Sequence, residues 1–546
     1  MNPLKIRRLT DIQPWEEASR RSVRAKLNQE EFHLEACKVC PKPIWFTAFF
    51  DGTGNNFDED GAGVKDVTKV KYSNISKLAQ FAHVAKGEIP RTHSVYIQGV
   101  GTPYGEVGDS GKGLDNAVGM AAAGMGQARI NKMLEKLEQA VKKDWPLVSQ
   151  INLAVFGFSR GATTARAFVH QLETKLAYSM GEHLYWKQFN ANDKQPEIVV
   201  YFMGLMDTVS STGFGGSSSE TAVRFGSAVL SPLLGGFLSA IDDGGHAAWA
   251  HDLSIPEYVK LCVHYVAGHE VREKFPSDSV RRDQAMPANC VETVYPGVHS
   301  DVGGGYAPAV STNQEGRNNE YSRIPLCHMF IDAYKAGVPF KEPGVILANA
   351  GGLFEITPEL ERIFDVYMDG APQNGGRLET SIIWHMNRYY EWRESRRRRL
   401  NDGRFKPKGG VDPYMKITDA EWESDVISVA KSQTGYFKTN AYPNEEAMFR
   451  AYKHEVVGAM NPPQRSDFDL FFDSYIHDSI AGFKKQMNDA FKPLGMTELS
   501  RWSINRKIFM GKRDDKFLYW RYEGWFPWDS GTKVAKLEDS DKTTTV

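Results

Sequence analysis

The chain has 546 residues, and its 66 lysines and arginines nearly balance 68 aspartates and glutamates, which leaves a net charge of −2. This balance excludes a global field that recruits nucleic acid, and five cysteines are too few for a disulfide scaffold. With 41% hydrophobic and 25% charged residues the composition is globular, and no apolar run reaches the ~18 residues of a membrane span. We therefore expect a monomer of several domains that binds no nucleic acid.

The first residues, 1–42, are polar and charged and lack the apolar stretch of a secretory signal. We expect them to form an N-terminal arm on a protein that is synthesised in the cytoplasm without a signal peptide. From residue 43 onward, apolar runs alternate with helical patterns. Strands are predicted over 43–50, 94–101, 151–158, 197–207, 260–270 and 290–300, with helices over 116–144 and 160–178. This alternation predicts an α/β domain over 43–345, with a mostly parallel sheet flanked by helices.

Residues 346–546 have a different texture, because they are rich in charged and aromatic residues and show a helical pattern over 380–400. We expect a second, largely helical C-terminal region that serves as an accessory domain. Arg393 and Arg396 to Arg399 form a basic cluster within this pattern. The cluster either contacts anionic lipid headgroups or, in the interpretation we favour, lies on a solvated helix face.

The strongest motif is Gly157-Phe158-Ser159-Arg160-Gly161, which has the form G-x-S-x-G. The bare pattern is weak, but here an apolar strand runs into it and an alanine-rich helix runs out of it. That setting is what a nucleophile elbow of an α/β-hydrolase-like sheet requires, because the tight turn exposes the serine hydroxyl above the sheet. We predict that Ser159 is the nucleophile; the alternative is an ordinary turn between strand and helix.

A serine nucleophile needs a base and a carboxylate that orients the base, in the chain order Ser, acid, His. Asp207 ends a predicted strand and is the candidate acid. Among three downstream histidines, His264 lies inside an apolar run and reads as a core residue, and His269 reads as a salt-linked structural position. His299 is followed by a glycine-rich loop and is the candidate base, with Asp301 as an alternative acid.

An oxyanion hole requires two preorganised donors. One is expected to be the backbone N–H of Arg160, which directly follows the nucleophile. The second is expected near Gly52 and Thr53, in the turn after the first strand, where a glycine permits a close backbone approach. A turn with only a conformational role is the alternative for these two residues.

Five motifs together resemble one family: FFDGTGNN (49–56), VYIQGVGT (95–102), VFGFSRGATTARAF (155–168), MGLMDTV (203–209) and YPGVHSDVGGGY (295–306). They are similar to the α/β hydrolases that include the type VI secretion lipase effectors, and more narrowly to the phospholipase A effectors of the first type. The resemblance spans about 45–340, and the family's Ser, Asp and His fall on Ser159, Asp207 and His299.

The resemblance implies hydrolysis of acyl esters in membrane phospholipids by an antibacterial toxin that acts in the periplasm of a target cell. It also implies a VgrG-type spike as carrier, a cognate immunity protein, and a membrane-docking role for the C-terminal region. The chemistry requires no metal or other cofactor, while the sequence leaves a structural or regulatory Ca²⁺ open.

Residues 211–245 join a glycine- and serine-rich segment to an apolar one. A mobile apolar lid there would admit an acyl chain and exclude water, and an ordinary buried insertion has the same composition. Two other functions stay open: a soluble carboxylesterase or thioesterase with the same triad, and a non-catalytic interaction module that uses the hydrolase fold as a scaffold.

Overall fold

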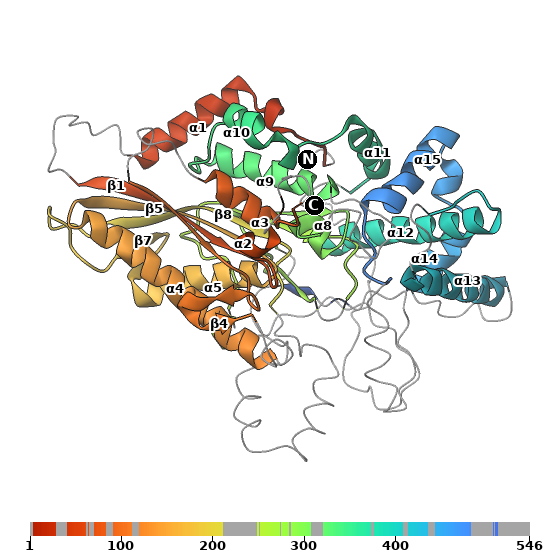
Figure 1. The fold of residues 1–546 in the computed structure, drawn as a ribbon, viewed down its shortest axis with the longest axis horizontal. Coiled ribbons are helices and arrows are strands. Elements are labelled where there is room, and N and C mark those ends of the chain that lie inside the picture. The colour runs from red at the N-terminus through yellow and green to blue at the C-terminus, as the bar shows by residue number, and fades with distance from the viewer. Residues whose placement is uncertain are drawn as a thin grey trace, which may run out of the picture.

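The structure is a computed structural model, and the reader can follow its elements in Figure 1. It describes residues 4–28, 41–61, 64, 70–82, 91–111, 119–210, 248–250, 252–272, 275–282, 285–306, 320–372, 376–407, 413–434, 443–481, 506 and 508–510. The proposed lid, 211–245, therefore lies outside the described residues.

A sheet of eight strands forms the centre of the fold. Six of its strands are parallel and run in the order β11-β9-β8-β5-β1-β2, while β7 is antiparallel to β8 and β6 is antiparallel to β7. The bounds are β1 Lys42–Phe50, β2 Thr92–Ile97, β5 Val148–Phe158, β6 Ala177–Met180, β7 His183–Trp186, β8 Glu197–Met206, β9 Cys262–Ala267 and β11 Cys290–Tyr295. Because the crossovers put all six parallel strands in one direction, their carboxyl ends meet at one edge of the sheet.

Helices cover both faces of this sheet (Figure 1). One face carries α1 (Pro14–Leu27), α3 (Asn74–Phe81), α9 (Arg323–Lys335) and α10 (Pro343–Ala350), and the other carries α4 (Gly119–Asp144) and α5 (Arg160–Lys175). The side chains of β1 show why both faces are buried, since Trp45 and Phe49 enter the first core, whereas Phe46 and Phe50 enter the second. Successive side chains of a strand point to opposite faces, so an unbroken apolar strand needs helices on both.

Short elements connect these layers. They are α2 (Phe57–Asp60), β3 (Pro103–Tyr104), β4 (Asp109–Ser110), β10 (Ser277–Ser279) and α8 (His299–Gly303). The predicted strands and helices of the α/β region are all present, but several are shorter than predicted. The strand predicted over 94–101 ends at Ile97, and the helix predicted over 160–178 ends at Lys175, before β6. The last strand also differs. That strand ends at Tyr295, and His299 opens the helix α8 instead of belonging to the strand end. The hairpin of β6 and β7 was not predicted, because both strands are only four residues long.

The C-terminal region is helical, as predicted, and lies at one end of the sheet (Figure 1). Its helices are α11 (Pro358–Met368), α12 (Leu378–Asn401), α13 (Pro413–Thr434), α14 (Pro443–Tyr452) and α15 (Pro462–Leu470). A short strand, β12 (Ile508–Met510), returns to the α/β region and pairs with β10 in parallel. The core that contains Phe49 also contains Trp392 and Trp422, so apolar packing continues across residue 345. The division into domains there stays a prediction.

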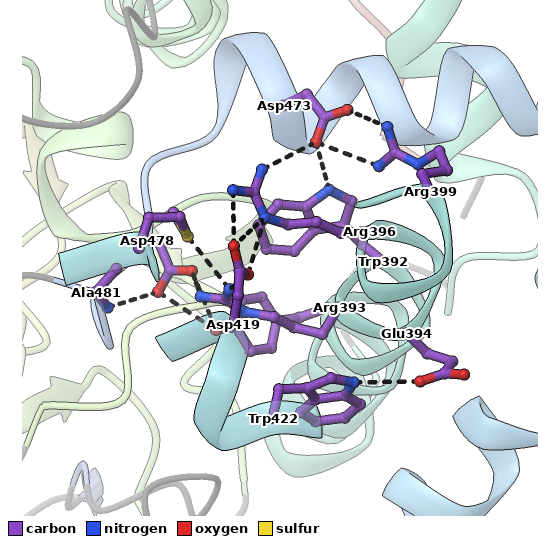
Figure 2. Close-up of polar contacts among 12 residues, drawn as sticks. Trp392, Arg393, Glu394, Arg396, Arg399, Asp419, Trp422, Asp473, Asp478 and Ala481 are labelled. Atoms are coloured by element: carbon purple, nitrogen blue, oxygen red, sulfur yellow. Dashed lines mark hydrogen bonds and ion pairs between the residues drawn. The ribbon is translucent and has the colours of Figure 1, made fainter. Parts of the chain in front are cut away.

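The basic cluster on α12 corrects the sequence analysis (Figure 2). Arg393 and Arg396 are 1% and 0% exposed, so they neither lie on a solvated face nor reach lipid headgroups. Both donate to Asp419 of α13, Arg393 at 3.0 Å and Arg396 at 2.9 Å, and Arg393 also pairs with Asp478. For these two arginines the sequence interpretation was wrong, because the carboxylates that compensate their buried charges come from distant parts of the chain. Arg397 to Arg399 are partly exposed, so the structure does not contradict a solvated face for them. Within the described residues, no helix is long and apolar enough to cross a membrane.

Candidate active site

Three predicted site residues follow the carboxyl ends of three parallel strands. Ser159 follows β5, Asp207 follows β8, and His299 opens α8 after β11. All three are buried, with Ser159 5%, Asp207 0% and His299 4% exposed. Since β5 and β8 are neighbours in the sheet, the turn that holds the serine and the turn that holds the aspartate lie side by side.

The turn at Ser159 is strained. Its backbone has φ 57° and ψ −128°, a combination that side-chain-bearing residues rarely adopt. The backbone N–H of Ser159 donates to the Met206 carbonyl at 3.0 Å, and its carbonyl accepts from the Val209 N–H at 3.2 Å. These two bonds tie the serine turn to both sides of Asp207, so the surrounding structure holds the strained conformation in place.

Small residues let the strand and helix of this turn approach each other. A Cβ at Gly161 would lie 2.3 Å from the Phe50 carbonyl oxygen and 2.4 Å from that of Asp51. A Cβ at Gly157 would lie 2.5 Å from Cα of Ala162. All three distances are shorter than real Cβ contacts, so the packing of α5 against β1 and β5 requires both glycines of the motif.

The histidine and the aspartate are hydrogen-bonded to each other. His299 Nδ1 donates to Asp207 Oδ2 at 2.6 Å, and the Ala267 backbone N–H donates to the other carboxylate oxygen, Oδ1, at 2.9 Å. Asp207 itself has a positive φ of 41°. This geometry fixes the proton of the neutral imidazole on Nδ1 and leaves Nε2 as the basic nitrogen.

One residue of this site was missed by the sequence analysis. Arg506, which precedes β12, donates from Nη2 to Asp207 Oδ2 at 2.7 Å and is 3% exposed. Nothing in the local sequence distinguishes Arg506 from the other arginines of the C-terminal region. The pairing of β12 with β10 brings it to the carboxyl edge of the sheet, beside Asp207.

The electrostatics of the pair favour an ionised aspartate and a neutral histidine. Burial alone would raise the pKa of Asp207, but Arg506 and the hydrogen bond from His299 hold it well below its ordinary value. Burial lowers the pKa of His299, and this effect exceeds the opposing attraction of Asp207. His299 is therefore unprotonated at neutral pH, which is the state in which it can accept a proton.

Aromatic rings enclose the imidazole. The ring of Phe158 lies 4.6 Å and the ring of Phe275 5.0 Å from the His299 ring, centroid to centroid. The His299 backbone N–H donates to Glu270 Oε2 at 3.3 Å. Among the described residues, no hydrogen bond joins Ser159 Oγ to His299 Nε2, a bond that often forms only when substrate is bound.

The alternative residues weighed from the sequence have other partners. Asp301 Oδ1 accepts from His477 Nδ1 at 2.7 Å instead of pairing with His299. His264 is fully buried, and His269 packs beside Tyr367, whose hydroxyl lies 3.0 Å from Nε2. The geometry thus favours Asp207 over Asp301 as the partner of His299, and it places His264 and His269 in the supporting structure.

The residues proposed for the oxyanion hole differ in whether their donor groups already make a hydrogen bond in the structure. The Gly52 N–H already donates to Asp51 Oδ1 at 2.7 Å. The Thr53 hydroxyl is buried and has no hydrogen-bond partner within the part of the chain that the structure describes. Arg160 is the first residue of α5, and the N–H groups of a first helical turn have no partner within the helix. A Cβ at Gly52 would lie 2.5 Å from the Phe158 ring, so this loop borders the serine turn.

Across the described part of the chain, no group of three or more His, Cys, Asp or Glu side chains is arranged to hold a metal ion. What the described residues do assemble is a buried Ser, His, Asp and Arg constellation at the carboxyl edge of a mostly parallel α/β sheet.

Comparison with known proteins identifies the family. The model of the T6SS phospholipase effector Tle1-like catalytic domain matches residues 46–181 and 170–332, together more than half of the chain. The chain belongs to this family, which confirms the resemblance seen in the sequence motifs. Membership gives it the role of a phospholipase effector that leaves the producing cell through the type VI system.

Two solved structures are similar to this one. A crystal structure of an uncharacterized protein from Pseudomonas aeruginosa has a TM-score of 0.54 and 22% identity, over 90% of this chain and 71% of that one. The structure of the Tle1 effector bound to the VgrG spike from the Type 6 secretion system has a TM-score of 0.40 and 18% identity, over 64% of this chain and 84% of that one. The first likeness supports the mixed, mostly parallel sheet with a helical C-terminal region. No curated protein matches the chain significantly.

Proposed function

We propose that this chain is a serine-dependent phospholipase A that hydrolyses acyl esters of membrane glycerophospholipids. The observation that carries the proposal is the 2.6 Å hydrogen bond from His299 Nδ1 to Asp207 Oδ2, at the sheet edge where the strained turn of Ser159 also lies. These are the three roles of a nucleophile, a base and an orienting acid, on residues in the chain order of α/β hydrolases.

In the proposed mechanism Ser159 Oγ attacks the ester carbonyl carbon while His299 Nε2 takes the hydroxyl proton. The tetrahedral intermediate collapses when the carbon–oxygen bond of the ester breaks, and the imidazolium gives its proton to the departing lysophospholipid oxygen. Water then attacks the acyl-enzyme with His299 as base again, which releases the fatty acid and restores Ser159. Asp207 holds the imidazole tautomer and stabilises its charge at both steps.

The negative charge of the tetrahedral intermediate needs donors in place before the reaction. We assign this role to the Arg160 N–H and to Thr53, whose buried hydroxyl has no partner among the described residues. The Gly52 N–H is bonded to Asp51, so we do not assign it as a donor. The lack of a side chain at Gly52 instead lets this loop pack against the Phe158 ring.

We further infer an α/β-hydrolase-type sheet within a catalytic domain over 43–345, preceded by an arm over 1–42 and followed by an accessory domain over 346–546. The six parallel strands with helices on both faces support this division of the α/β part. Membrane docking by the accessory domain is part of the proposal. It does not depend on Arg393 and Arg396, which are buried.

The proposed biological setting follows from the family. We infer that the enzyme is carried by a VgrG-type spike, acts on the membrane phospholipids of a target bacterium from its periplasm, and is blocked in the producer by a cognate immunity protein. A solved relative is bound to the VgrG spike, which supports this kind of carrier.

The test is fatty-acid release from vesicles of mixed-chain phosphatidylethanolamine, measured by mass spectrometry for the wild type and Ser159→Ala. The control variant is Ser94→Ala, since Ser94 lies exposed on the edge strand β2, and Ser159, Asp207 and His299 follow other strands of the sheet. Release of one chain by the wild type and Ser94→Ala, and none by Ser159→Ala, supports a phospholipase A and identifies the position cleaved.

Two other outcomes would change the assignment. Turnover of short soluble esters without release from vesicles would identify a carboxylesterase or thioesterase with the same triad. Unchanged toxicity of Ser159→Ala toward target cells would overturn catalysis as the basis of function and leave an interaction module.

A further inference from the structure

The carboxylate of Asp207 has three donors, and each comes from a different part of the chain. Oδ1 accepts from the Ala267 N–H at the end of β9, and Oδ2 accepts from both His299 Nδ1 and Arg506 Nη2. A serine triad requires only the histidine contact. The arginine is an addition to it, and it is contributed by the C-terminal region.

Arg506 is itself fixed by the backbone of the α/β region. Its Nε donates to the Phe275 carbonyl at 2.7 Å and its Nη1 to the Ala267 carbonyl at 3.2 Å. All three nitrogens of the guanidinium are thus engaged, and the side chain is 1% exposed. Because the planar guanidinium is held at two carbonyls, its third donor meets Asp207 Oδ2 in one orientation.

We propose that Arg506 is a positioning residue for the hydrolysis, which holds the Asp207 carboxylate in the orientation that receives the Nδ1–H of His299. This inference rests on the proposed serine mechanism and deepens it. Among the described residues, the hydrogen bonds of Arg506 go to Phe275, Ala267 and Asp207, and none goes to Ser159 or His299. It acts through Asp207, and Asp207 acts through His299.

The strand β12 places Arg506 at the site. Ile508, Phe509 and Met510 pair in parallel register with Ser277, Asp278 and Ser279 of β10. β10 is joined in turn to the aspartate turn, since the Asp278 N–H donates to the Thr208 carbonyl at 3.1 Å. The catalytic acid, β10 and β12 therefore form one hydrogen-bonded unit, and the C-terminal region completes the surroundings of the acid.

The burial of the Asp207 carboxylate explains why an arginine beside it would assist the reaction. Asp207 is fully buried, and desolvation disfavours its ionised form, which is the form that orients the imidazole. A buried arginine at 2.7 Å keeps the carboxylate ionised when bound substrate excludes the remaining water. Its positive charge also offsets part of the attraction that Asp207 exerts on the protonated imidazole.

The other charged groups near His299 form pairs of their own. Glu270 accepts from the His299 backbone N–H and is bonded to Arg272 at 2.6 Å. On the opposite side of α8, Asp301 is paired with His477. Replacing Arg506 therefore removes the positive charge that compensates Asp207 beside His299. The uncompensated carboxylate should then make His299 easier to protonate.

The test compares Arg506→Gln, Arg506→Lys and the wild type by the rate at which a soluble fluorophosphonate labels Ser159 between pH 5 and 9. Arg396→Gln is the matched control, because Arg396 is a buried arginine of α12 that donates to Asp419 of α13. Thermal unfolding of each variant measures the folded fraction, to which the labelling rates are scaled. Labelling does not depend on the phospholipid substrate, so it separates this inference from the substrate assignment.

We expect Arg506→Gln to label about 10²-fold more slowly at its optimum, as displaced catalytic groups do. The acidic limb of its pH profile should move up by about one unit, since a neighbouring charge shifts a pKa by that much or more. Arg506→Lys should keep the wild-type limb and recover part of the rate. Arg396→Gln should lose thermal stability without any movement of the limb.

Several results would overturn the role of Arg506. A limb that stays in place or moves down in Arg506→Gln, or a rate that falls only with the folded fraction, would make it a structural residue. A wild type that is not labelled at Ser159 would instead overturn the serine mechanism and the positioning role with it.

Discussion

His264 and Glu292 lie directly opposite each other on β9 and β11, and His264 Nδ1 donates to Glu292 Oε2 at 3.0 Å. The other ring nitrogen, Nε2, accepts from the backbone N–H of Thr208 at 3.2 Å. His264 is therefore the neutral Nδ1–H tautomer, and it connects the sheet interior to the residue that follows Asp207. His264 thus bonds to the backbone of the aspartate turn at Thr208, whereas His299 and Arg506 bond to the Asp207 side chain.

We predict that Glu292→Gln destabilises the fold. Glu292 accepts from His264, Arg281 and Ser279, and the substitution removes the negative charge that the buried Arg281 guanidinium contacts at 3.0 Å. Breaking a buried pair in this way costs about 3–5 kcal/mol of the free energy of unfolding, measured by urea denaturation. The control is Glu197→Gln, which breaks the solvent-exposed contact with His183. Equal losses in the two variants would contradict the supporting role of Glu292.

Gly161→Ala should disrupt the serine turn. The added Cβ would meet two backbone carbonyl oxygens, of Phe50 and Asp51, and backbone cannot move aside as a flexible side chain can. We expect a loss of about 2 kcal/mol or more from overpacking, together with a loss of Ser159 labelling. Gly344→Ala is the matched control, because a Cβ there meets nothing within 4 Å in helix α10. A stable, fully labelled Gly161→Ala variant would refute the close packing.

The pH profile of hydrolysis should reflect the buried histidine. Burial lowers the pKa of His299 below 6.5, and the base must be unprotonated to act. The acidic limb of kcat/KM is therefore expected below pH 6.5, with activity rising through that limb and level at neutral pH. Initial rates on a soluble ester between pH 4.5 and 8 measure it. A limb above pH 6.5 would contradict the lowered pKa.

Acid should destabilise the protein before most carboxylates titrate. Burial lowers the pKa of His269 to about 4 and that of His328 to about 3. The unfolded state binds these protons first, so the stabilisation is complete above pH 6.5 and is lost as the pH falls toward 4. At ~1.4 kcal/mol per pKa unit, the full shift corresponds to about 3 kcal/mol for His269 and about 5 kcal/mol for His328, and the loss for His328 continues below pH 4.

His328→Gln checks this expectation, because the amide can replace the imidazole as acceptor for the Arg7 N–H without titrating. Urea unfolding at pH 7.5, 5.5 and 4.5 should show a shallower loss of stability in this variant than in the wild type. Parallel slopes for His328→Gln and the wild type would contradict the prediction.

The sequence predicted those features whose signal is local. The central strands are unbroken apolar runs, and Ser159 was visible because its strand, turn and helix are contiguous. Asp207 and His299 could be chosen from chain order and from the ends of apolar runs.

The features that were missed depend on contacts between distant residues. The charged helix α12 looks solvated in sequence, but Arg393 and Arg396 are buried against carboxylates such as Asp419. Arg506 has no motif around it, and its role appears only when a strand of three residues pairs with another of equal length. Such pairings leave no periodicity from which a prediction could be made.

Arg506 and Asp207 are 299 residues apart in the chain. A ribosome makes the aspartate long before the arginine, so the nascent α/β region folds for a time without its final contact. If Arg506 positions the aspartate, a nascent chain that contains Ser159, Asp207 and His299 still lacks the arginine that orients the Asp207 carboxylate. The order of synthesis would then delay full activity until Arg506 has been made and β12 has paired with β10.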